Sequence, residues 1–333
     1  MIKENRFLVI GSNSFTGSNF IARLISSSYE CIGISRSQEL EDPFLSYKWT
    51  QAYRESFKFY QLDLNNDQDK IAALIKEEEI SHIVNFAAQS MVGQSWDFPE
   101  DWYETNVVSI SKFVNKIRDI ESIKNFVSVT TPEVYGSTDG WVKENSDFKP
   151  STPYAISRAA QDMHLRACFE NFKFPVTFTR AANVYGPGQS LYRIIPRTLI
   201  EALTNGNLIL DGGGKSERSF IHIDDVCDAT LKICLKGELG STYHISTDQS
   251  IQIIDLVNLI AKICNKDLED FVSFGPERPG KDSAYLLDSL KLRNELSWKD
   301  EITIERGLTD TLEWMEENID FLKTCKRDYI HKK

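Results

Sequence analysis

The stretch FLVIGSNSFTGSNF, residues 7–20, contains the strand, turn and helix start that decide the fold. Four apolar residues end at Gly11, and from Gly17 to about Ser27 the apolar residues recur at helical spacing. This order predicts a βα unit, whose turn and helix N-terminus bring backbone amides close to a phosphate. The middle position of a GxxGxxG spacing is a serine here, so an ordinary βα turn is the alternative. We predict a dinucleotide site formed by Gly11, Ser14, Phe15, Thr16 and Gly17.

The first 180 residues alternate between short apolar runs and amphipathic segments. Apolar runs bounded by turn residues predict strands, and helices between them predict parallel βαβ units. The predicted strands are residues 7–10, 29–34, 57–62, 81–86, 125–129 and 175–179, and the predicted helices are residues 17–27, 71–79, 102–117 and 154–172. We therefore expect an α/β fold with a Rossmann-like doubly wound parallel sheet.

After residue 180 the alternation becomes less regular. Helices are predicted at residues 194–205, 225–235, 251–263 and 308–324, with short strands at 208–211 and 219–223. We expect a dinucleotide-binding domain at residues 1–180, with returning segments from about 219–250, and a smaller mixed α/β substrate-binding lobe at residues 181–333.

The composition argues against several classes of protein. The net charge of −11, with a pI near 5.1 and no block of like charge, argues against non-specific nucleic-acid binding. The six cysteines are scattered without a CxxC pair, which predicts reduced thiols in a cytoplasmic protein. The five histidines have no metal-ligand spacing, so no metal site is predicted. No signal peptide and no apolar run of membrane-spanning length are found, so no membrane partner is expected.

The end of the second predicted strand bears on the choice of cofactor. NAD-binding chains usually place an acid there to hold the ribose 2′-hydroxyl, but this stretch reads GISRS, residues 33–37. A guanidinium beside hydroxyls suits a 2′-phosphate, so Arg36 favours NADP, with NAD possible. The alternative is a solvated Arg36 that touches no cofactor. Asp63, after the third strand, is placed to meet the adenine.

The segment VTTPEVYGS, residues 129–137, places a carboxylate directly after a predicted strand. A proline cannot donate a ladder hydrogen bond, so the strand should end before Pro132. Glu133 would then lie at the mouth of the strand, where either a catalytic carboxylate or a turn charge is expected.

A tyrosine and an arginine at 154 and 158 are four residues apart in a predicted helix, hence on one face. A cation beside a phenol lowers its pKa, because it stabilises the phenolate. A phenolate beside a nicotinamide can take a proton from a sugar hydroxyl as hydride leaves. The alternative is a tyrosine at a helix start with a solvated arginine.

Together these motifs resemble the extended short-chain dehydrogenase/reductases that act on nucleotide sugars, and among them the sugar-nucleotide 4,6-dehydratases such as dTDP-glucose and GDP-mannose 4,6-dehydratase. The resemblance covers nearly the whole chain. Besides the Gly11 turn, it is carried by NFAAQ (85–89), TN (105–106), TPEVYG (131–136), YxxxR (154–158), RAANVYGP (180–187), GKSERSFIHIDD (214–225), RPGKD (278–282) and LDS (287–289).

Two residues depart from the family pattern. The usual YxxxK reads YxxxR, and arginine keeps the positive charge but is bulkier and never deprotonates. Where dTDP-glucose dehydratases have Thr-Asp-Glu, this chain has Thr131, Pro132 and Glu133, and proline cannot protonate a leaving group. GDP-mannose dehydratases also lack that aspartate, so its loss does not exclude dehydration.

The resemblance implies a catalytic cycle. Tyr154, assisted by Arg158, takes the proton of the sugar O4 while C4 is oxidised, and Thr131 holds O4. Glu133 removes the C5 proton, water leaves C6, and hydride returns to C6. We expect Glu133 to return its proton to the leaving oxygen, with a water or another side chain as the alternative acid. The cofactor is regenerated, so it should be held tightly.

The resemblance also implies the remaining contacts. It adds Leu64, Ala87, Ala88, Gln89 and Asn106 to the cofactor-binding residues, together with Tyr154 and Arg158. The expected substrate-binding residues are Gln89, Ser90, Asn183, Arg193, Arg218 and Lys281, with Arg218 on the diphosphate. Surface solvation is the alternative for the three basic residues.

Three other functions stay open at this point: a nucleotide-sugar 4-epimerase, a UDP-glucuronate decarboxylase and a non-catalytic nucleotide-sugar binder. Epimerases typically lack a glutamate at position 133, whereas the decarboxylase has one. The expected partner is a nucleotide-diphosphate sugar, and its nucleotide is open. The stretch QSLYRIIP, residues 189–196, resembles dehydratases of amino-sugar pathways, so an N-acetylhexosamine is a candidate. The family's usual homodimer would pair the helices at 102–117 and 154–172.

Overall fold

The computed structural model describes residues 5–332 with the exception of residues 51–55, 139, 146 and 277–285. Its centre is a seven-stranded sheet in the order β3-β2-β1-β4-β5-β7-β12, in which every pair is parallel. The order reverses beside β1, which is the pattern of a Rossmann-like sheet and confirms the predicted fold class. The strands are β1 Arg6–Ile10, β2 Glu30–Ser35, β3 Phe57–Gln61, β4 His82–Asn85, β5 Asn125–Thr130, β7 Val176–Ala181 and β12 Thr242–Ile245.

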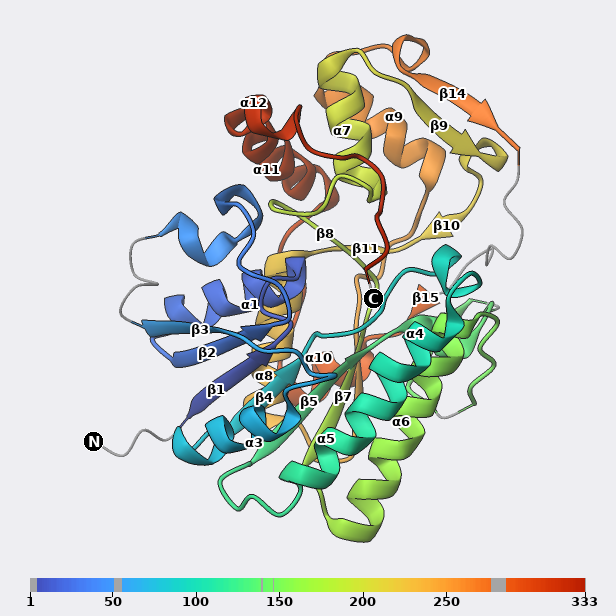
Figure 1. The fold of residues 1–333 in the computed structure, drawn as a ribbon. Coiled ribbons are helices and arrows are strands. Elements are labelled where there is room, and N and C mark those ends of the chain that lie inside the picture. Colours follow the sequence, from blue (N-terminus) through green and yellow to red (C-terminus); the bar gives the residue numbers. More distant parts are fainter. Residues whose placement is uncertain (1–4, 51–55, 139, 146, 277–285, 333) are drawn as a thin grey trace.

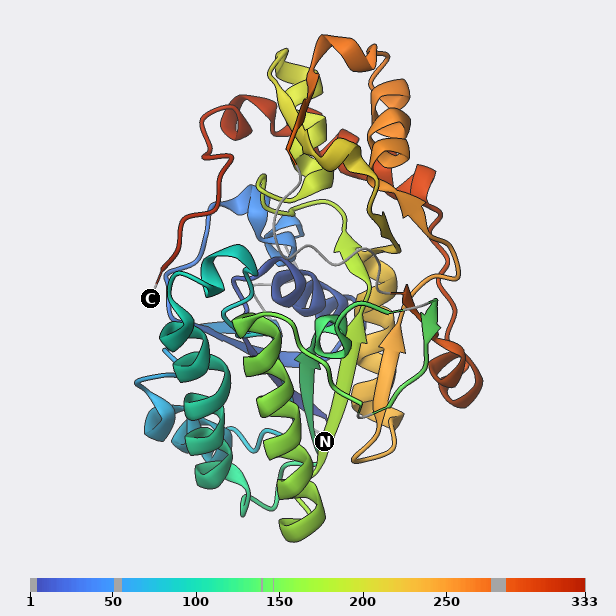
Figure 2. The same ribbon diagram turned by 90° about the vertical axis from the view of Figure 1, so that its right-hand side faces the viewer.

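Helices cover both faces of the sheet (Figures 1 and 2). The helices α1 (Phe15–Ser26) and α8 (Ile223–Lys236) pack on one face, and α3 (Gln68–Glu77), α5 (Ile110–Ile117) and α6 (Pro153–Phe172) pack on the other. Neighbouring residues of one strand enter different cores: Leu8 faces α3 and α5, and Val9 faces α1. Burial on both faces explains why these strands read as continuous apolar runs.

A smaller lobe lies above the sheet in Figure 1. Its helices pack around a core that includes Leu199, Leu256, Leu308 and Met315. The lobe contains α7 (Ile194–Thr204), α9 (Ile253–Ile263), α11 (Ile304–Glu317), α12 (Ile319–Leu322) and the pairs β9 (Leu208–Asp211) with β14 (Val272–Gly275) and β10 (Glu217–Arg218) with β13 (Ile251–Gln252). Two short strands, β8 (Asn183–Tyr185) and β11 (Phe220–His222), pair in parallel below it.

Two predicted helices differ in detail from the structure: one contains a π-helical segment, and the other is interrupted. The segment predicted at 102–117 consists of α4 (Pro99–Tyr103), a π-helix at Glu104–Ser109 and α5. The segment predicted at 308–324 changes from α11 to α12 at Asn318. The helical backbone continues without a break through the π-helix, so the helix predicted at 102–117 is confirmed, although apolar spacing does not resolve the wider turn. The helix predicted at 308–324 was right in location and wrong in continuity.

The last strand of the sheet, β12, was not predicted. It has only four residues and includes His244, whose ring is completely buried and bonded to the Tyr135 hydroxyl at 2.8 Å. A polar residue in so short a run conceals the strand. Through β12 the chain returns to the main sheet beside β7. The division into two domains stays a prediction.

Candidate active site

Two cavities lie at opposite ends of the parallel strands. The one at the carboxyl ends has a volume of about 230 Å³ and lies where the strand order reverses beside β1. Crevices at this position bind ligands in open α/β sheets. Its lining includes eight residues predicted to bind cofactor: Gly11, Ser14, Arg36, Asp63, Leu64, Ala87, Ala88 and Gln89.

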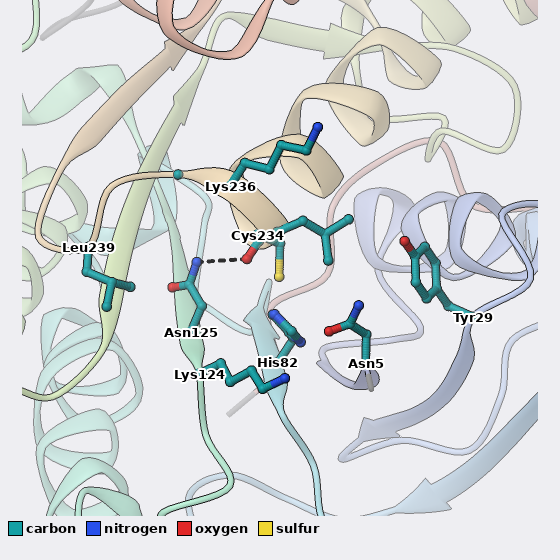
Figure 3. Close-up of a pocket in the computed structure, with 10 residues that line it drawn as sticks. Asn5, Tyr29, His82, Lys124, Asn125, Cys234, Lys236 and Leu239 are labelled. Atoms are coloured by element: carbon teal, nitrogen blue, oxygen red, sulfur yellow. Dashed lines mark hydrogen bonds between the residues drawn. The ribbon is translucent and has the colours of Figure 1, made fainter. Parts of the chain in front are cut away.

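The second cavity, of about 470 Å³, lies at the amino ends of β4 and β5 (Figure 3). His82 and Asn125, the first residues of these strands, line it, and the Asn125 amide donates to the Cys234 carbonyl at 3.0 Å. Burial, aided by the nearby Lys124 charge, lowers the pKa of His82 to about 4. None of the predicted catalytic residues lines this cavity, because they follow the other ends of the strands.

The glycine turn lets the backbone after β1 pack closely against the backbone after β4. Gly11 has a φ of +84°, and a Cβ there would lie 2.7 Å from the Ala87 nitrogen. Ser14, the residue that weakened the sequence signal, is the N-cap of α1: its Oγ accepts from the Gly17 nitrogen at 3.1 Å and donates to the Gly11 carbonyl at 2.7 Å. Phe15 and Thr16 open the helix behind it. We call this turn at Gly11, which has no side chain and lies beside the N-terminus of α1, the glycine cradle; it fits a dinucleotide diphosphate.

Asn13, which the sequence analysis missed, holds the loop after β2 at the rim of this cavity. Its amide nitrogen donates to the carbonyls of Gln38 at 2.8 Å and Ser37 at 3.1 Å, and its backbone nitrogen donates to Ser35 Oγ at 3.0 Å. The signal available in the sequence was an asparagine between the first strand and the helix cap. The structure shows that this side chain is buried. Arg36 lines the same rim and donates to the Lys332 carbonyl at 2.9 Å.

Asp63 lines the cavity, but its carboxylate also stabilises its own turn. Its Oδ1 accepts from the Asn65 nitrogen at 2.9 Å, and its Oδ2 accepts from the Asn66 side chain at 2.7 Å. A contact with adenine stays a prediction.

Asn106 acts on the cavity through Gln89. Its Oδ1 accepts from the Gln89 nitrogen, and its Nδ2 donates to the Gln89 carbonyl and to Ser157 Oγ, each at 2.9 Å. Asn106 is completely buried in the π-helix and therefore joins the loop after β4 to α6. It is a positioning residue.

The strand β5 ends at Thr130, as the proline predicts. Thr131 then caps a 3-10 turn, Pro132–Tyr135, and its Oγ1 accepts from the Glu133 nitrogen at 3.3 Å. Pro132 takes the first position of this turn, where no N–H donor is needed and its φ is already suitable. The proline therefore shapes the turn that carries Glu133 to the carboxyl end of the sheet.

The Tyr154 phenol lies among the other predicted catalytic groups. It opens α6 next to Thr152, whose Oγ1 caps the helix. Burial raises the pKa of Tyr154 above its ordinary value, Arg158 opposes this most strongly, and Glu133 raises it further. A hydrogen bond with the Thr131 side chain and the charge of Arg193 lower it. Arg158, Glu133, Thr131 and Arg193 thus all act on the same phenol.

The sequence led us to expect that Arg158 lowers the pKa of Tyr154. The structure corrects this expectation, because the pKa is raised overall. Arg158 acts in the expected direction, but burial outweighs it. The Arg158 guanidinium is buried, with one nitrogen donating to the Val129 carbonyl and another to Gln161 Oε1 at 2.9 Å. Arg158 thus also holds α6 against β5, the strand that leads to Thr131 and Glu133.

A second buried network supports the same strand end, and the sequence analysis did not identify it. Arg180 and Asp162 form an ion pair at 2.7 Å with both side chains fully buried, and Thr130 Oγ1 donates to the same carboxylate at 3.2 Å. The sequence signal for this network was Arg180, which directly follows the strand predicted at 175–179.

The predicted substrate residues are only partly brought together. Gln89 lines the cavity, and Arg193, just before α7, acts on Tyr154. Asn183 on β8 and Arg218 on β10 lie on strands near the lobe, and neither lines the cavity. Ser90 is exposed. Lys281 lies outside the described residues.

The described part of the chain offers neither a metal cluster nor a membrane-spanning helix. No cluster of three or more histidine, cysteine or acidic side chains there could hold a metal ion. None of the helices described is both long and apolar enough to cross a membrane.

A Rossmann-like sheet with a glycine turn, and a tyrosine helix beside a threonine–glutamate turn, are the features of an extended short-chain dehydrogenase/reductase that acts on nucleotide sugars. The family model described as GDP-mannose 4,6 dehydratase matches residues 8–311, and the chain belongs to this family.

Characterised relatives share the whole chain at moderate identity. A trifunctional UDP-glucose 4,6-dehydratase/UDP-4-keto-6-deoxy-D-glucose 3,5-epimerase/UDP-4-keto-L-rhamnose-reductase of Arabidopsis thaliana is 30% identical over 95% of this chain and 48% of its own length. The chain thus spans about half the length of that relative. The dTDP-D-glucose 4,6-dehydratase of Homo sapiens is 29% identical over 97% of this chain and 93% of its own length.

Among solved structures, DesIV, a dTDP-glucose 4,6-dehydratase from Streptomyces venezuelae with NAD bound, has a TM-score of 0.87 at 29% identity, covering 95% of this chain and 98% of its own. A UDP-glucose 4-epimerase from Thermotoga maritima has a TM-score of 0.85 at 22% identity, covering 94% of this chain and 99% of its own, which is a likeness of fold alone.

Proposed function

We propose that the protein is a sugar-nucleotide 4,6-dehydratase that converts a nucleoside-diphosphate hexose to its 4-keto-6-deoxy form. The carrying observation is that Thr131, directly after β5, caps the turn that holds Glu133 and hydrogen-bonds the Tyr154 phenol with its side chain. A glutamate at this place gives the site a base for C5, which a 4-epimerase does not need. The family match and the dehydratase relatives support the same reaction.

A bound nicotinamide would supply the hydride chemistry of this cycle, which oxidises C4 and later reduces C6. Tyr154 takes the O4 proton, and Thr131 orients O4 through its hydroxyl. Burial raises the pKa of Tyr154 and so disfavours the phenolate, which is the base. The positive charge of Arg158 opposes this effect and stabilises the phenolate. Gly11 and Ser14 would hold the diphosphate of the cofactor, and Gln89 lines the same cavity.

Glu133 serves both proton transfers at C5 and C6. As a carboxylate it removes the C5 proton, which the C4 ketone makes acidic, and as the resulting acid it returns that proton to the C6 oxygen, which leaves as water. When hydride returns to C6, a proton from solvent adds to C5 and completes the 4-keto-6-deoxy sugar. Pro132 cannot take part, and its place at the start of the turn is structural. One carboxyl group thus replaces the aspartate and glutamate of the dTDP-glucose enzymes.

NAD is the cofactor we propose, although Arg36 alone favours NADP. The dehydratases from Streptomyces venezuelae and Bacillus anthracis hold NAD in their solved structures. Arg36 donates to the Lys332 carbonyl, which supports a role for this guanidinium other than binding a 2′-phosphate. Retention of added NAD but not NADP through gel filtration is the expected result, and preferential retention of NADP would reverse the choice.

The test of function is incubation of the purified protein with GDP-, UDP-, dTDP- and CDP-hexoses and UDP-N-acetylhexosamines in deuterated water, followed by mass spectrometry. Dehydration with one deuterium gained at C5 is expected, and the reactive sugar identifies the substrate. Relatives that act on UDP-glucose and dTDP-glucose place these two first in the panel. An unchanged mass with a new 4-epimer, a loss of carbon dioxide, or binding without turnover would each contradict the proposal.

We also propose a homodimer through α4 to α6. Ile156 and Met163 on α6 are 43% and 63% exposed, and Tyr103 and Val108 on the neighbouring helical segments are about equally open at 36% and 37%. Apolar side chains gathered on adjacent helices are typical of an interface. Met163→Glu should convert a dimer to a monomer in analytical ultracentrifugation, and a wild-type monomer would refute the assembly.

The compartment we propose is the cytoplasm. All six cysteines lie in described residues and are free thiols, which suits a reducing environment.

A further inference from the structure

The segment after α12 leaves the lobe and crosses toward the main sheet. In Figure 1 it descends as the red trace from α12 to the C-terminal mark above the sheet. Arg327 anchors its start on α7, where the guanidinium donates to Glu201 Oε2 at 2.5 Å and to Thr204 Oγ1 at 3.1 Å. Arg197 on the same helix donates to the Arg327 carbonyl at 2.6 Å.

His331 anchors the other end of this segment on α4. Its ring stacks on Phe98 and on Trp102, each with centroids 5.0 Å apart and interplanar angles of 11° and 18°. Its Nε2 lies 2.7 Å from Asp101 Oδ2. Between the two anchors, Tyr329 packs edge-on against Tyr192 at 5.4 Å. The segment is therefore held at three places along its length.

The next residue joins the two rims of the carboxyl-end cavity. The Lys332 carbonyl accepts from Arg36 Nη2 at 2.9 Å and from Gln89 Nε2 at 2.7 Å. Arg36 follows β2 and Gln89 follows β4, so these donors come from either side of β1 and its glycine turn. Among the described residues, none after Thr105 lines the cavity itself. The segment thus spans the rims from outside and does not fill the space between them.

We propose that residues 327–332 form a strap over the dinucleotide site that retains the cofactor between turnovers. This rests on the proposed function, because only a cycle that regenerates its cofactor profits from such retention. Release of the dinucleotide then requires the carbonyl of Lys332 to leave Arg36 and Gln89, and the His331 stack to open. The strap also assigns Arg36 a role that its sequence position did not suggest.

The experiment measures the dissociation rate of NADH by the change in its fluorescence when the loaded protein is mixed with excess NAD, without any sugar. His331→Ala removes the stack and the Asp101 contact, and Tyr329→Ala removes the middle anchor. His164→Ala on α6 is the matched control, since His164 contacts Cys168 and not the strap. Melting temperatures of all variants establish that they are folded.

We expect His331→Ala to accelerate dissociation at least about tenfold, Tyr329→Ala by less, and the control to equal the wild type. Unchanged rates in both strap variants would overturn the proposal. Slower dissociation, or tighter binding, would overturn it in another way, because the segment would then compete with the cofactor. Since no sugar is used, these outcomes are independent of whether the protein dehydrates its substrate.

Discussion

The cavities at the two ends of the sheet differ in size and in the residues that line them. The cavity at the amino ends is larger, about 470 Å³ against about 230 Å³, and is lined by polar side chains such as His82, Lys124 and Asn125. The smaller cavity at the carboxyl ends has the glycine cradle, and the Thr131–Glu133 turn and Tyr154 follow the same ends of the strands.

The difference teaches that strand direction locates this site better than cavity size. In a parallel sheet every βα turn and helix N-terminus lies at the carboxyl ends, where backbone amides can meet an anion. At the amino ends the strands begin, and side chains such as Asn125 satisfy neighbouring backbone, here the Cys234 carbonyl. The predictions below separate the two ends experimentally.

The largest difference in kcat is expected between two variants that each lose one tyrosine hydroxyl, one at each end of the sheet. Tyr154→Phe deletes the proton acceptor of the proposed cycle and should lower kcat about 10²–10⁴-fold, the usual range for a general base. Tyr29→Phe makes the same change at the amino-end cavity and should leave kcat within about twofold, since surface changes away from a site have small effects. Turnover of the reactive sugar is the measurement. Comparable losses in both variants would erase the contrast between the two ends.

An intermediate effect is expected at Arg158. Its charge is the chief influence that opposes burial at Tyr154, so Arg158→Met should raise the pKa of the phenol further. Because the phenolate is the active form, the acid limb of the kcat/KM profile should move to higher pH, and activity near neutral pH should fall about 10–100-fold. Arg158→Lys, which restores a positive charge, should move the limb back. A profile unchanged in Arg158→Met would limit Arg158 to its contacts with Val129 and Gln161.

The smallest effect is on stability and involves both ends. Burial lowers the pKa of His82 to about 4 and that of His244, near the catalytic strand, to about 3. In the unfolded chain both would have a pKa near 6.5, so below that pH the unfolded state binds more protons and folding is weakened. Each should remove about 1.4 kcal/mol of unfolding free energy per pH unit as the pH falls from about 6.5 toward 4.

Urea unfolding at about pH 7.5 and about pH 5 measures this slope. His82→Gln should remove the contribution of His82 to the pH dependence of the unfolding free energy. Turnover should stay unchanged, because His82 lies at the amino ends of the strands. A steep slope that His82→Gln does not reduce would show that this histidine is already protonated in the folded protein.

Much of the arrangement could be read from the residues, because local patterns set it. The apolar runs predicted six strands of the sheet, and Pro132 predicted the end of β5. The π-helix and β12 were missed because they depend on packing: one wider turn leaves the apolar spacing nearly intact, and His244 is buried only because distant groups satisfy its ring.

The sequence by itself therefore determined the order along the chain of six of the seven sheet strands, and the residue types at the strand ends, since both depend on neighbours within a few residues. Only the tertiary structure decided that burial outweighs Arg158 at Tyr154, that Asn106 holds Gln89, and that Lys332 reaches Arg36. Burial of a side chain exists only after the chain has folded. The same holds for a contact such as that between Arg36 and Lys332, which are 296 residues apart.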